Sequence, residues 1–195
     1  MSIRIEYNIM SIHVNGYWIG SEVESQHLFD SNLCKSLTYF FKNEKCKNLV
    51  DFGCGMGNYV NEFIKNDINA IGYDGNPNTP EMTNNTCKVL DLSVPTNFND
   101  RFEWVMSLEV GEHLPKQFEE TFINNLHVNN VKGIVLSWAI TGQGGDGHVN
   151  CQNNDYVKSI FHKLNYINDI DAENMLRKNA SLHWFKNTIM VFRKQ

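Results

Sequence analysis

The chain has 195 residues, of which 42% are hydrophobic, so its length and composition suit one domain with a continuous apolar core. Its formal net charge is −5 and it contains no run rich in lysine and arginine, which argues against a nucleic-acid-binding surface. The apolar stretches have the length of strands, and no basic segment leads into a hydrophobic signal core. We therefore expect a cytoplasmic protein that binds neither nucleic acid nor membranes.

The five cysteines are odd in number and include no C-x-x-C pair. This pattern favours reduced thiols over a disulfide framework or a zinc site. No sequence pattern specifies an oligomeric state.

Residues 1–46 are predicted to form an N-terminal extension that ends in a leading helix, ahead of a core over residues 47–195. The helix is predicted over residues 25–42, because apolar residues there share one helical face. Leu28 and Phe29 belong to this face, which we expect to pack on the sheet of the core.

Beyond the leading helix, apolar runs alternate with helical patterns, as in a parallel sheet covered by helices on both faces. Strands are predicted over residues 47–52, 68–73, 87–90, 103–108 and 133–139. Helices are predicted over residues 58–66 and 115–128 from the spacing of their apolar residues. A helix over 154–164, a strand over 166–169, a helix over 172–179 and a final strand within 182–193 follow.

The first strand of the core runs into an acidic turn, in the stretch Val50-Asp-Phe-Gly-Cys-Gly-Met-Gly57. Its glycines allow backbone angles that a Cβ would forbid, and they let a ligand approach bare main chain at the start of the next helix. A dinucleotide fingerprint would have its third glycine at Asn58 and an apolar residue at Asp51. An acid at Asp51 instead suits a ligand with a positive charge, such as S-adenosylmethionine (SAM).

This stretch resembles the first motif of class I SAM-dependent methyltransferases, and the resemblance extends over residues 25–195. It implies a single three-layer α/β/α domain of Rossmann-like fold. Its sheet would be mostly parallel and seven-stranded, with an antiparallel last strand inserted beside the fifth. The resemblance also implies SAM as cofactor. The residues that it implies in the first cofactor motif are Asp51, Gly53, Cys54, Gly55 and Gly57.

Two further acids follow the second and third predicted strands. Asp74, with Gly75 after it, stands where an acid can accept hydrogen bonds from both ribose hydroxyls. An ordinary Asp-Gly turn is the alternative. Asp91 and Leu92 match the position where the family contacts adenine, and a helix cap or turn is the alternative for Asp91.

The stretch from Trp104 to Pro115 resembles the fourth motif of the family, in which a strand ends ahead of a Glu-His pair. The resemblance implies that Leu108 and Glu109 border the methionine part of the cofactor. Glu112 and His113 are candidates for the wall of the reaction chamber. Alternatively, His113 holds the loop through hydrogen bonds.

The loop over residues 137–150 follows the fifth strand and contains four glycines, a glutamine and His148. Such a loop at the carboxyl end of the sheet is typical of a substrate pocket, although a flexible surface loop is the alternative. A hydroxyl acceptor must lose its proton during methyl transfer, and an imidazole is suited to accept it. The candidates for this general base are His148, His113 and His27, in that order. His27 is expected at the start of the leading helix, where a capping or surface role is equally compatible.

Metal ligands are the other interpretation of this region. Glu109, Glu112, His113, Asp146 and His148 offer suitable atoms, but no local ligand spacing requires an ion, and we predict no metal. The aromatic side chains of Trp18, Trp138 and Trp184 could stack on a substrate but are more typical of core positions, and we assign them no role.

The loop and the chain's last strand resemble a subgroup of small methyltransferases from large DNA viruses and bacteria, some of which occur beside glycosyltransferases. This resemblance implies O-methylation of a sugar or glycan hydroxyl, in a host cytoplasm if the protein is viral. The alternatives are a small-molecule or protein methyltransferase and a catalytically silent SAM-binding module. A nicotinamide-dependent reductase is a further alternative, disfavoured by Asp51 and Asn58.

Overall fold

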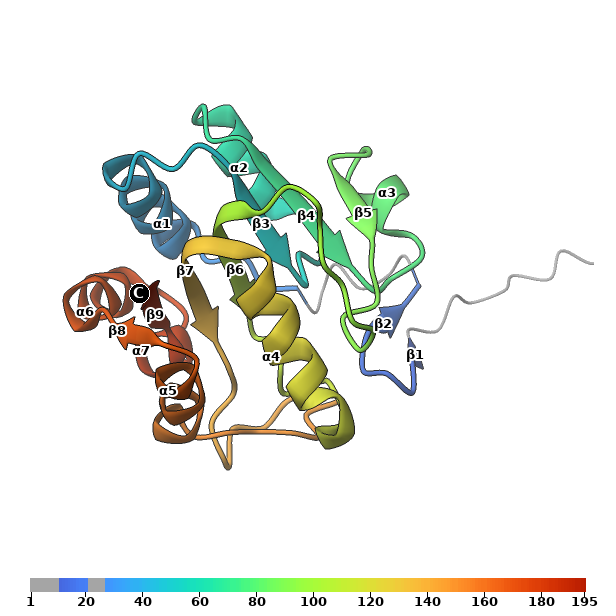
Figure 1. The fold of residues 1–195 in the computed structure, drawn as a ribbon. Helices are drawn as coiled ribbons and strands as arrows, with labels where there is room; N and C mark the ends of the chain where they lie inside the picture. Colours follow the sequence, from blue (N-terminus) through green and yellow to red (C-terminus); the bar gives the residue numbers. More distant parts are fainter. Residues whose placement is uncertain (1–10, 21–26) are drawn as a thin grey trace, which may run out of the picture.

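The computed structural model describes residues 11–20 and 27–195, and its centre is a seven-stranded sheet (Figure 1). The strand order is β5-β4-β3-β6-β7-β9-β8. Strand β9 pairs antiparallel with both neighbours, and the other pairings of this sheet are parallel. The strands are β3 (Leu49–Phe52), β4 (Ala70–Asp74), β5 (Cys87–Val89), β6 (Phe102–Leu108), β7 (Asn130–Ser137), β8 (Tyr166–Asn168) and β9 (Met190–Lys194). The predicted fold class and the insertion of the antiparallel last strand beside the fifth are confirmed.

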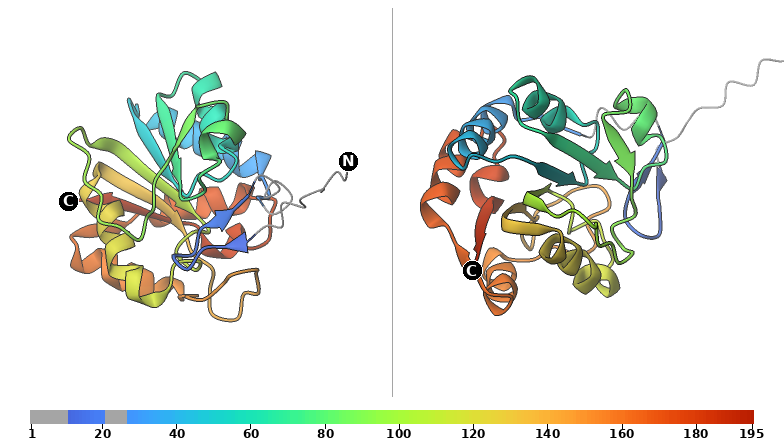
Figure 2. Two further views of the ribbon diagram at one scale, coloured as in Figure 1. Left: turned by 90° about the vertical axis from the view of Figure 1, so that its right-hand side faces the viewer. Right: turned by 45° about the horizontal axis from the view of Figure 1, so that its top comes forward.

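Helices cover both faces of the sheet, as Figures 1 and 2 show. Helices α1, α2, α6 and α7 pack on one face, and α4 and α5 pack on the other. Their bounds are α1 (Ser31–Asn43), α2 (Asn58–Lys65), α3 (Thr79–Met82), α4 (Glu119–Val128), α5 (Asn154–Lys163), α6 (Ile170–Asn179) and α7 (Phe185–Thr188). A 3₁₀ helix over Lys116–Phe118 leads into α4.

The alternation of side chains along the central strands explains why both faces are apolar. In β6, Trp104 and Met106 pack under α1, whereas Val105 between them packs in the core on the other face. Strand β3 divides in the same way, with Leu49 on the first face and Val50 on the second. A parallel strand buried on both faces is therefore apolar at successive positions, which is the pattern that predicted these strands.

Helix α1 begins later than predicted, and Asp30 accounts for the difference. Its carboxylate accepts hydrogen bonds from the backbone N–H groups of Asn32 and Leu33, so it is the N-cap. Leu28 and Phe29 lie ahead of this cap and are 57% and 37% exposed, so the prediction that they share the buried helical face was wrong. Part of the predicted helix, residues 25–26, lies outside the described residues.

The N-terminal extension contains an antiparallel hairpin that the sequence pattern did not predict. It is formed by β1 (Ser11–Ile12) and β2 (Trp18–Ile19). The hairpin lies beside the carboxyl end of the main sheet (Figure 2), where Asn15 donates a hydrogen bond to the Asp91 carboxylate at 2.7 Å. Strands of two residues are too short to show alternation, so this element had no periodic signal.

Candidate active site

A cavity of about 320 Å³ opens at the carboxyl ends of the parallel strands. Its wall is formed by the turns after β3, β4, β5 and β6, by the loop after β7, and by the hairpin and the start of α7. Open α/β sheets bind their ligands at this edge. The predicted cofactor residues that line it are Asp51, Gly53, Cys54, Gly55, Asp74, Gly75, Asp91, Leu92, Leu108 and Glu109. Gly57 was also predicted to bind the cofactor, but it does not line the cavity and is instead the N-cap of α2.

The glycine turn after β3 has the backbone geometry that its sequence required. Gly53, Gly55 and Gly57 have φ angles of 80°, 52° and 69°, all in the left-handed region that side chains rarely adopt. The N–H of Gly55 donates to a carboxylate oxygen of Asp74 at 2.9 Å, which joins this turn to the end of β4. The turn therefore brings bare backbone to the cavity and opens helix α2 behind it.

Asp51 is a buried acid without a nearby cation. Its side chain is 3% exposed, and burial, together with the Cys87 thiol and the Asp74 carboxylate, raises its pKa well above the usual range. The described residues give Asp51 no ion pair. A ligand with a positive charge would supply the missing counter-charge, so the site fits a cation such as the SAM ammonium.

Asp74 ends β4 and is held by backbone donors. Its Oδ2 accepts from Gly55 and its Oδ1 accepts from Asn76, each at 2.9 Å. An ionised carboxylate offers about four acceptor positions, so both oxygens retain capacity for the two hydroxyls of a ribose.

Asp91 combines the two roles that the sequence left open. Its Oδ1 accepts from the N–H and the hydroxyl of Ser93, as in a turn, while Asp91 also lines the cavity. Its Oδ2 accepts the amide of Asn15 from the hairpin at 2.7 Å. A ligand amino group at Asp91 would therefore share this oxygen with Asn15.

Glu109 follows β6 in a left-handed conformation, with φ of 53°, which is uncommon for a residue with a side chain. Its N–H donates to the Ser137 hydroxyl at 2.8 Å. Its carboxylate accepts from the Gln143 amide at 2.7 Å and from the Thr188 hydroxyl at 3.1 Å. Glu109 thus ties the end of β6 to the loop after β7 and to α7, and burial raises its pKa.

The structure brings three of the proposed chamber residues together. Glu112, His113 and His148 each offer one ligand-type atom, and these atoms lie within 4.8 Å of one another. We call these residues the Glu-His cluster. Both histidines line the cavity, and Glu112 lies behind them with 0% exposure.

His148 is oriented by the backbone of its own loop. Its Nδ1 lies 3.1 Å from the carbonyl oxygen of Gln143, so Nδ1 carries the proton in this contact. In the neutral ring the lone pair then belongs to Nε2, which lies 4.0 Å from a carboxylate oxygen of Glu112. The side chain of His148 is 13% exposed, so a ligand in the cavity can reach it.

His113 is a weaker base than an ordinary histidine. Burial, followed by the nearby His148 and His27 rings, lowers its pKa to about 4. Its ring packs edge-on against Trp18 and His148, with centroid distances of 5.6 and 5.0 Å. His113 is therefore neutral near neutral pH.

His27 lies ahead of α1 rather than inside it, and it lines the cavity at the glycine turn. A Cβ at Gly55 would lie 2.4 Å from the His27 ring. The ring of Trp18 packs against His27 at a centroid distance of 5.0 Å. His27 is not part of the Glu-His cluster.

The sequence did not predict the aromatic side chains in the wall of the cavity. Tyr17, Trp18, Trp184 and Phe185 line the cavity, although no role was assigned to them. Their neighbouring residues show no motif that could have signalled this position. Trp138, in contrast, is fully buried, in agreement with its interpretation as a core residue.

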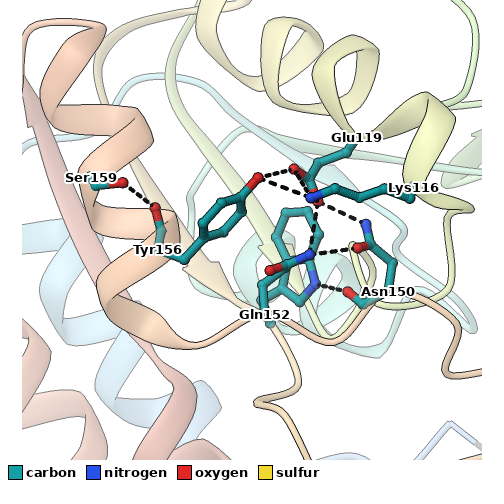
Figure 3. A network of polar contacts seen from close by, with 7 residues as sticks. Lys116, Glu119, Asn150, Gln152, Tyr156 and Ser159 are labelled. Atoms are coloured by element: carbon teal, nitrogen blue, oxygen red, sulfur yellow. Dashed lines mark hydrogen bonds and ion pairs between the residues drawn. The ribbon is translucent and has the colours of Figure 1, made fainter.

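A polar network around the buried Glu119 and Asn150 holds the far end of the loop after β7 (Figure 3). Glu119 of α4 accepts hydrogen bonds from Tyr156 at 2.6 Å and from Asn150 at 3.0 Å, and it pairs with Lys116 at 2.7 Å. The backbone N–H of Asn150 in turn donates to the carbonyl of Glu112 at 2.9 Å. The network therefore fixes the loop that carries His148 against the segment that carries Glu112.

The family of the chain follows from comparison with known proteins. A family model described as a methyltransferase domain matches residues 25–127, which is more than half of the sequence. The chain belongs to this methyltransferase family. No curated protein matches the sequence.

Solved structures share the fold at low identity. Magnesium protoporphyrin IX methyltransferase from Synechocystis, with bound S-adenosylhomocysteine (SAH), has a TM-score of 0.65 at 13% identity over 83% of this chain and 82% of that one. An amino pentose methyltransferase from Micromonospora echinaspora, with bound SAM, has a TM-score of 0.64 at 11% identity over 87% and 93%. A Burkholderia thailandensis methyltransferase with bound 1,6-didemethyltoxoflavin and SAH has a TM-score of 0.58 at 12% identity over 85% and 79%. The shared fold, together with the methyltransferase family model, confirms the resemblance to class I SAM-dependent methyltransferases.

Among the residues that the structure describes, none of the helices has both the length and the apolar character needed to cross a bilayer.

Proposed function

We propose that this methyltransferase uses SAM to methylate a hydroxyl of a sugar or glycan. The observation that carries the proposal is His148, because it lines the cavity and its Nδ1 contact leaves the Nε2 lone pair for a proton. A hydroxyl must lose its proton to become a nucleophile, and a positioned imidazole is suited to this step. His113 is the poorer acceptor because of its low pKa.

The residues of the glycine turn and the strand ends would hold the cofactor. Asp51 would pair with the ammonium group, and Asp74 with the ribose hydroxyls, beside the backbone of Gly55 and Gly75. Asp91 and Leu92 would contact adenine. Leu108 and Glu109 would border the methionine part, with the methyl group facing the histidines. SAM supplies that methyl group from its sulfonium.

The choice of a sugar rests on the aromatic wall and on one relative. Trp18 and Trp184 line the cavity and offer flat apolar faces with a polar edge. Such faces are suited to the C–H surface of a sugar ring. One structural relative is an amino pentose methyltransferase, and it supports a sugar acceptor. The porphyrin and toxoflavin relatives favour a non-sugar small molecule as the second candidate.

The test is a screen for SAH release with nucleotide sugars, free glycosides, small phenols and peptides. SAH release with a glycoside or nucleotide sugar supports the proposal. SAH release with only a phenol or only a peptide would contradict the sugar acceptor and identify a different acceptor class. A catalytically silent module would bind SAM and release no SAH with any acceptor class.

The His148→Ala variant tests the assignment of the proton acceptor. We expect turnover to fall by about 10²–10⁴-fold. SAM binding should stay near the wild-type level, because His148 would act on the acceptor. The matched control is His162→Ala on the exposed side of α5, which should leave turnover unchanged. Equal losses of turnover and SAM affinity in His148→Ala would make the residue structural instead.

A further inference from the structure

The Glu-His cluster has the composition of a metal-binding site. It combines two imidazoles with one carboxylate. Two of its members come from adjacent positions after β6, and His148 comes from the loop after β7. We propose that Glu112, His113 and His148 bind a divalent first-row transition-metal ion. The inference rests on the proposed methylation of a hydroxyl by SAM, and it gives His148 the role of a metal ligand in place of that of the proton acceptor.

The carboxylate of Glu112 is the first independent observation. The side chain is 0% exposed, and neither of its oxygens makes a hydrogen bond of good geometry among the described residues. Besides the two histidines, the polar groups near it are the Glu109 carboxylate and the backbone of Glu112 and Ala139, and none of these supplies a cationic partner. Buried polar groups are nearly always hydrogen-bonded, and a buried carboxylate without a partner is strongly unfavourable. A cation next to these oxygens would satisfy them, and no lysine or arginine of the described residues forms an ion pair with Glu112.

The second observation is that the backbone holds the two ligand segments together. The carbonyl oxygen of Glu112 accepts the N–H groups of both Val149 and Asn150 at 2.9 Å. These bonds fasten the His148 loop directly to the residue that supplies the carboxylate. The Nδ1 of His148 meets the carbonyl of Gln143, which is the kind of outer contact that orients a metal-binding histidine.

The donor set indicates which ions would bind. Two imidazoles and a carboxylate occur in catalytic zinc sites and in iron(II) sites that keep open positions. Magnesium and calcium prefer oxygen ligands alone. In a tetrahedral site with ion–ligand distances of about 2.0–2.2 Å, the ligand atoms lie about 3.3–3.6 Å apart. The cluster atoms lie within 4.8 Å of one another, so metal binding would draw them together by up to about 1.5 Å.

The ion would have open positions on the side of the cavity, because both histidines line it and Glu112 lies behind. The ion would lower the pKa of an acceptor hydroxyl that coordinates there, and the hydroxyl would lose its proton to water. Its oxygen would form the bond to the methyl carbon as the methyl–sulfur bond breaks, and the sulfonium would become a neutral thioether. In this metal-bound form the Nε2 lone pair of His148 binds the ion, so His148 is a ligand rather than the proton acceptor.

The direct test is a metal titration of protein that has been dialysed against EDTA. Binding of Co²⁺ is monitored by its visible absorption, and binding of Zn²⁺ and Mn²⁺ is measured by calorimetry. We expect saturable binding of one ion per chain and a rise in thermal stability. Glu112→Gln and His148→Ala should each weaken Co²⁺ binding by at least about tenfold. The controls are Glu120→Gln and His162→Ala, which change exposed residues of α4 and α5 and should bind as the wild type does.

Two results would overturn the inference. One is the absence of saturable binding of all three ions, and the other is unchanged Co²⁺ affinity in both cluster variants. If SAH release is insensitive to EDTA and to added metal while His148→Ala is inactive, the proposed role of the metal is wrong, and the imidazole of His148 remains the proton acceptor. If the ion binds through the cluster but no hydroxyl acceptor gives SAH, the proposed function fails and the metal site stands.

Discussion

At the scale of single residues, the site depends on acids that the fold keeps away from solvent. Asp51 is the last residue but one of β3, and Asp74 is the last residue of the adjacent strand β4. They are in register with Gly72 and Val89 respectively. Asp74 is satisfied by backbone donors, whereas Asp51 is buried and lacks a counter-charge. The two acids should therefore respond differently to substitution and to pH.

Replacement of Asp74 by alanine should weaken SAM binding by at least about tenfold. Hydrogen bonds to a charged group contribute about 1.5–3 kcal/mol, and two ribose hydroxyls would lose their partner. Calorimetric titration with SAM measures the effect, and Asp155→Ala on α5 is the exposed control. An unchanged affinity would remove Asp74 from the cofactor site.

SAM binding should strengthen as the pH rises through the raised pKa of Asp51. The free protein holds Asp51 protonated up to that pKa, and pairing with an ammonium requires the ionised form, so binding releases a proton. The trend should weaken as the pH approaches about 7.7, where an α-amino group is half deprotonated. Calorimetry in buffers of different ionisation enthalpy detects the proton, and Asp51→Asn should abolish its release. If Asp51→Asn releases as many protons on SAM binding as the wild type does, the assignment of the proton to Asp51 is wrong.

At the scale of elements, the loop after β7 is held at both ends. The carboxylate of Glu109 accepts a hydrogen bond from Gln143 in this loop, and the carboxylate of Glu119 in α4 accepts one from Asn150 at the far end of the loop. Burial alone would raise the pKa of Glu119, but hydrogen bonds from Lys116, Tyr156 and Asn150 outweigh burial and lower it. The network is therefore an ionised one that positions the loop.

Glu119→Gln should lower the free energy of unfolding at neutral pH by about 1–3 kcal/mol, because charged hydrogen bonds are lost in a buried site. The folded pKa of Glu119 is depressed, so its stabilisation is present above the unfolded pKa of about 4.3 and disappears as the pH falls through the folded value. The difference between variant and wild type should thus shrink in acid. Urea unfolding across pH measures it, with Glu120→Gln as control, and a constant difference would argue against an ionised Glu119.

At the scale of the whole molecule, the sheet core carries the site. Trp104 of β6 is fully buried and packs edge-on against Phe40 and Phe41 of α1, with centroid distances of 5.0 and 6.0 Å. The same strand ends at Leu108, in the cavity wall. Packing between the sheet and α1 therefore sets the position of the strand ends.

Trp104→Ala should destabilise the fold by about 3–5 kcal/mol, since it leaves a large cavity in the core. Ile134→Val, on the opposite face of the sheet, is the milder comparison at about 0.5–1.5 kcal/mol. Urea unfolding measures both. A similarly small decrease in the free energy of unfolding for both variants would indicate that neighbouring side chains repack into the space of the lost ring.

Several features of this protein could be predicted from sequence because their physical causes are local. The glycine turn requires left-handed backbone angles at Gly53, Gly55 and Gly57, and this requirement acts on each residue by itself. Strands buried on both faces must be apolar at successive positions, which identified the sheet. Asp51, Asp74 and Asp91 could then be placed, because strand ends of a parallel sheet share one edge.

Which distant segments meet depends on packing between elements and could not be predicted from the sequence. Residues that converge from separate loops, such as Glu112 and His148, have no sequence pattern because their distance depends on how β6 and β7 pair and on where the loop is anchored. The same holds for Trp18 and Trp184, which reach the cavity from opposite ends of the chain. Local backbone preferences are encoded residue by residue, whereas the composition of a cavity wall depends on packing between elements far apart in the sequence.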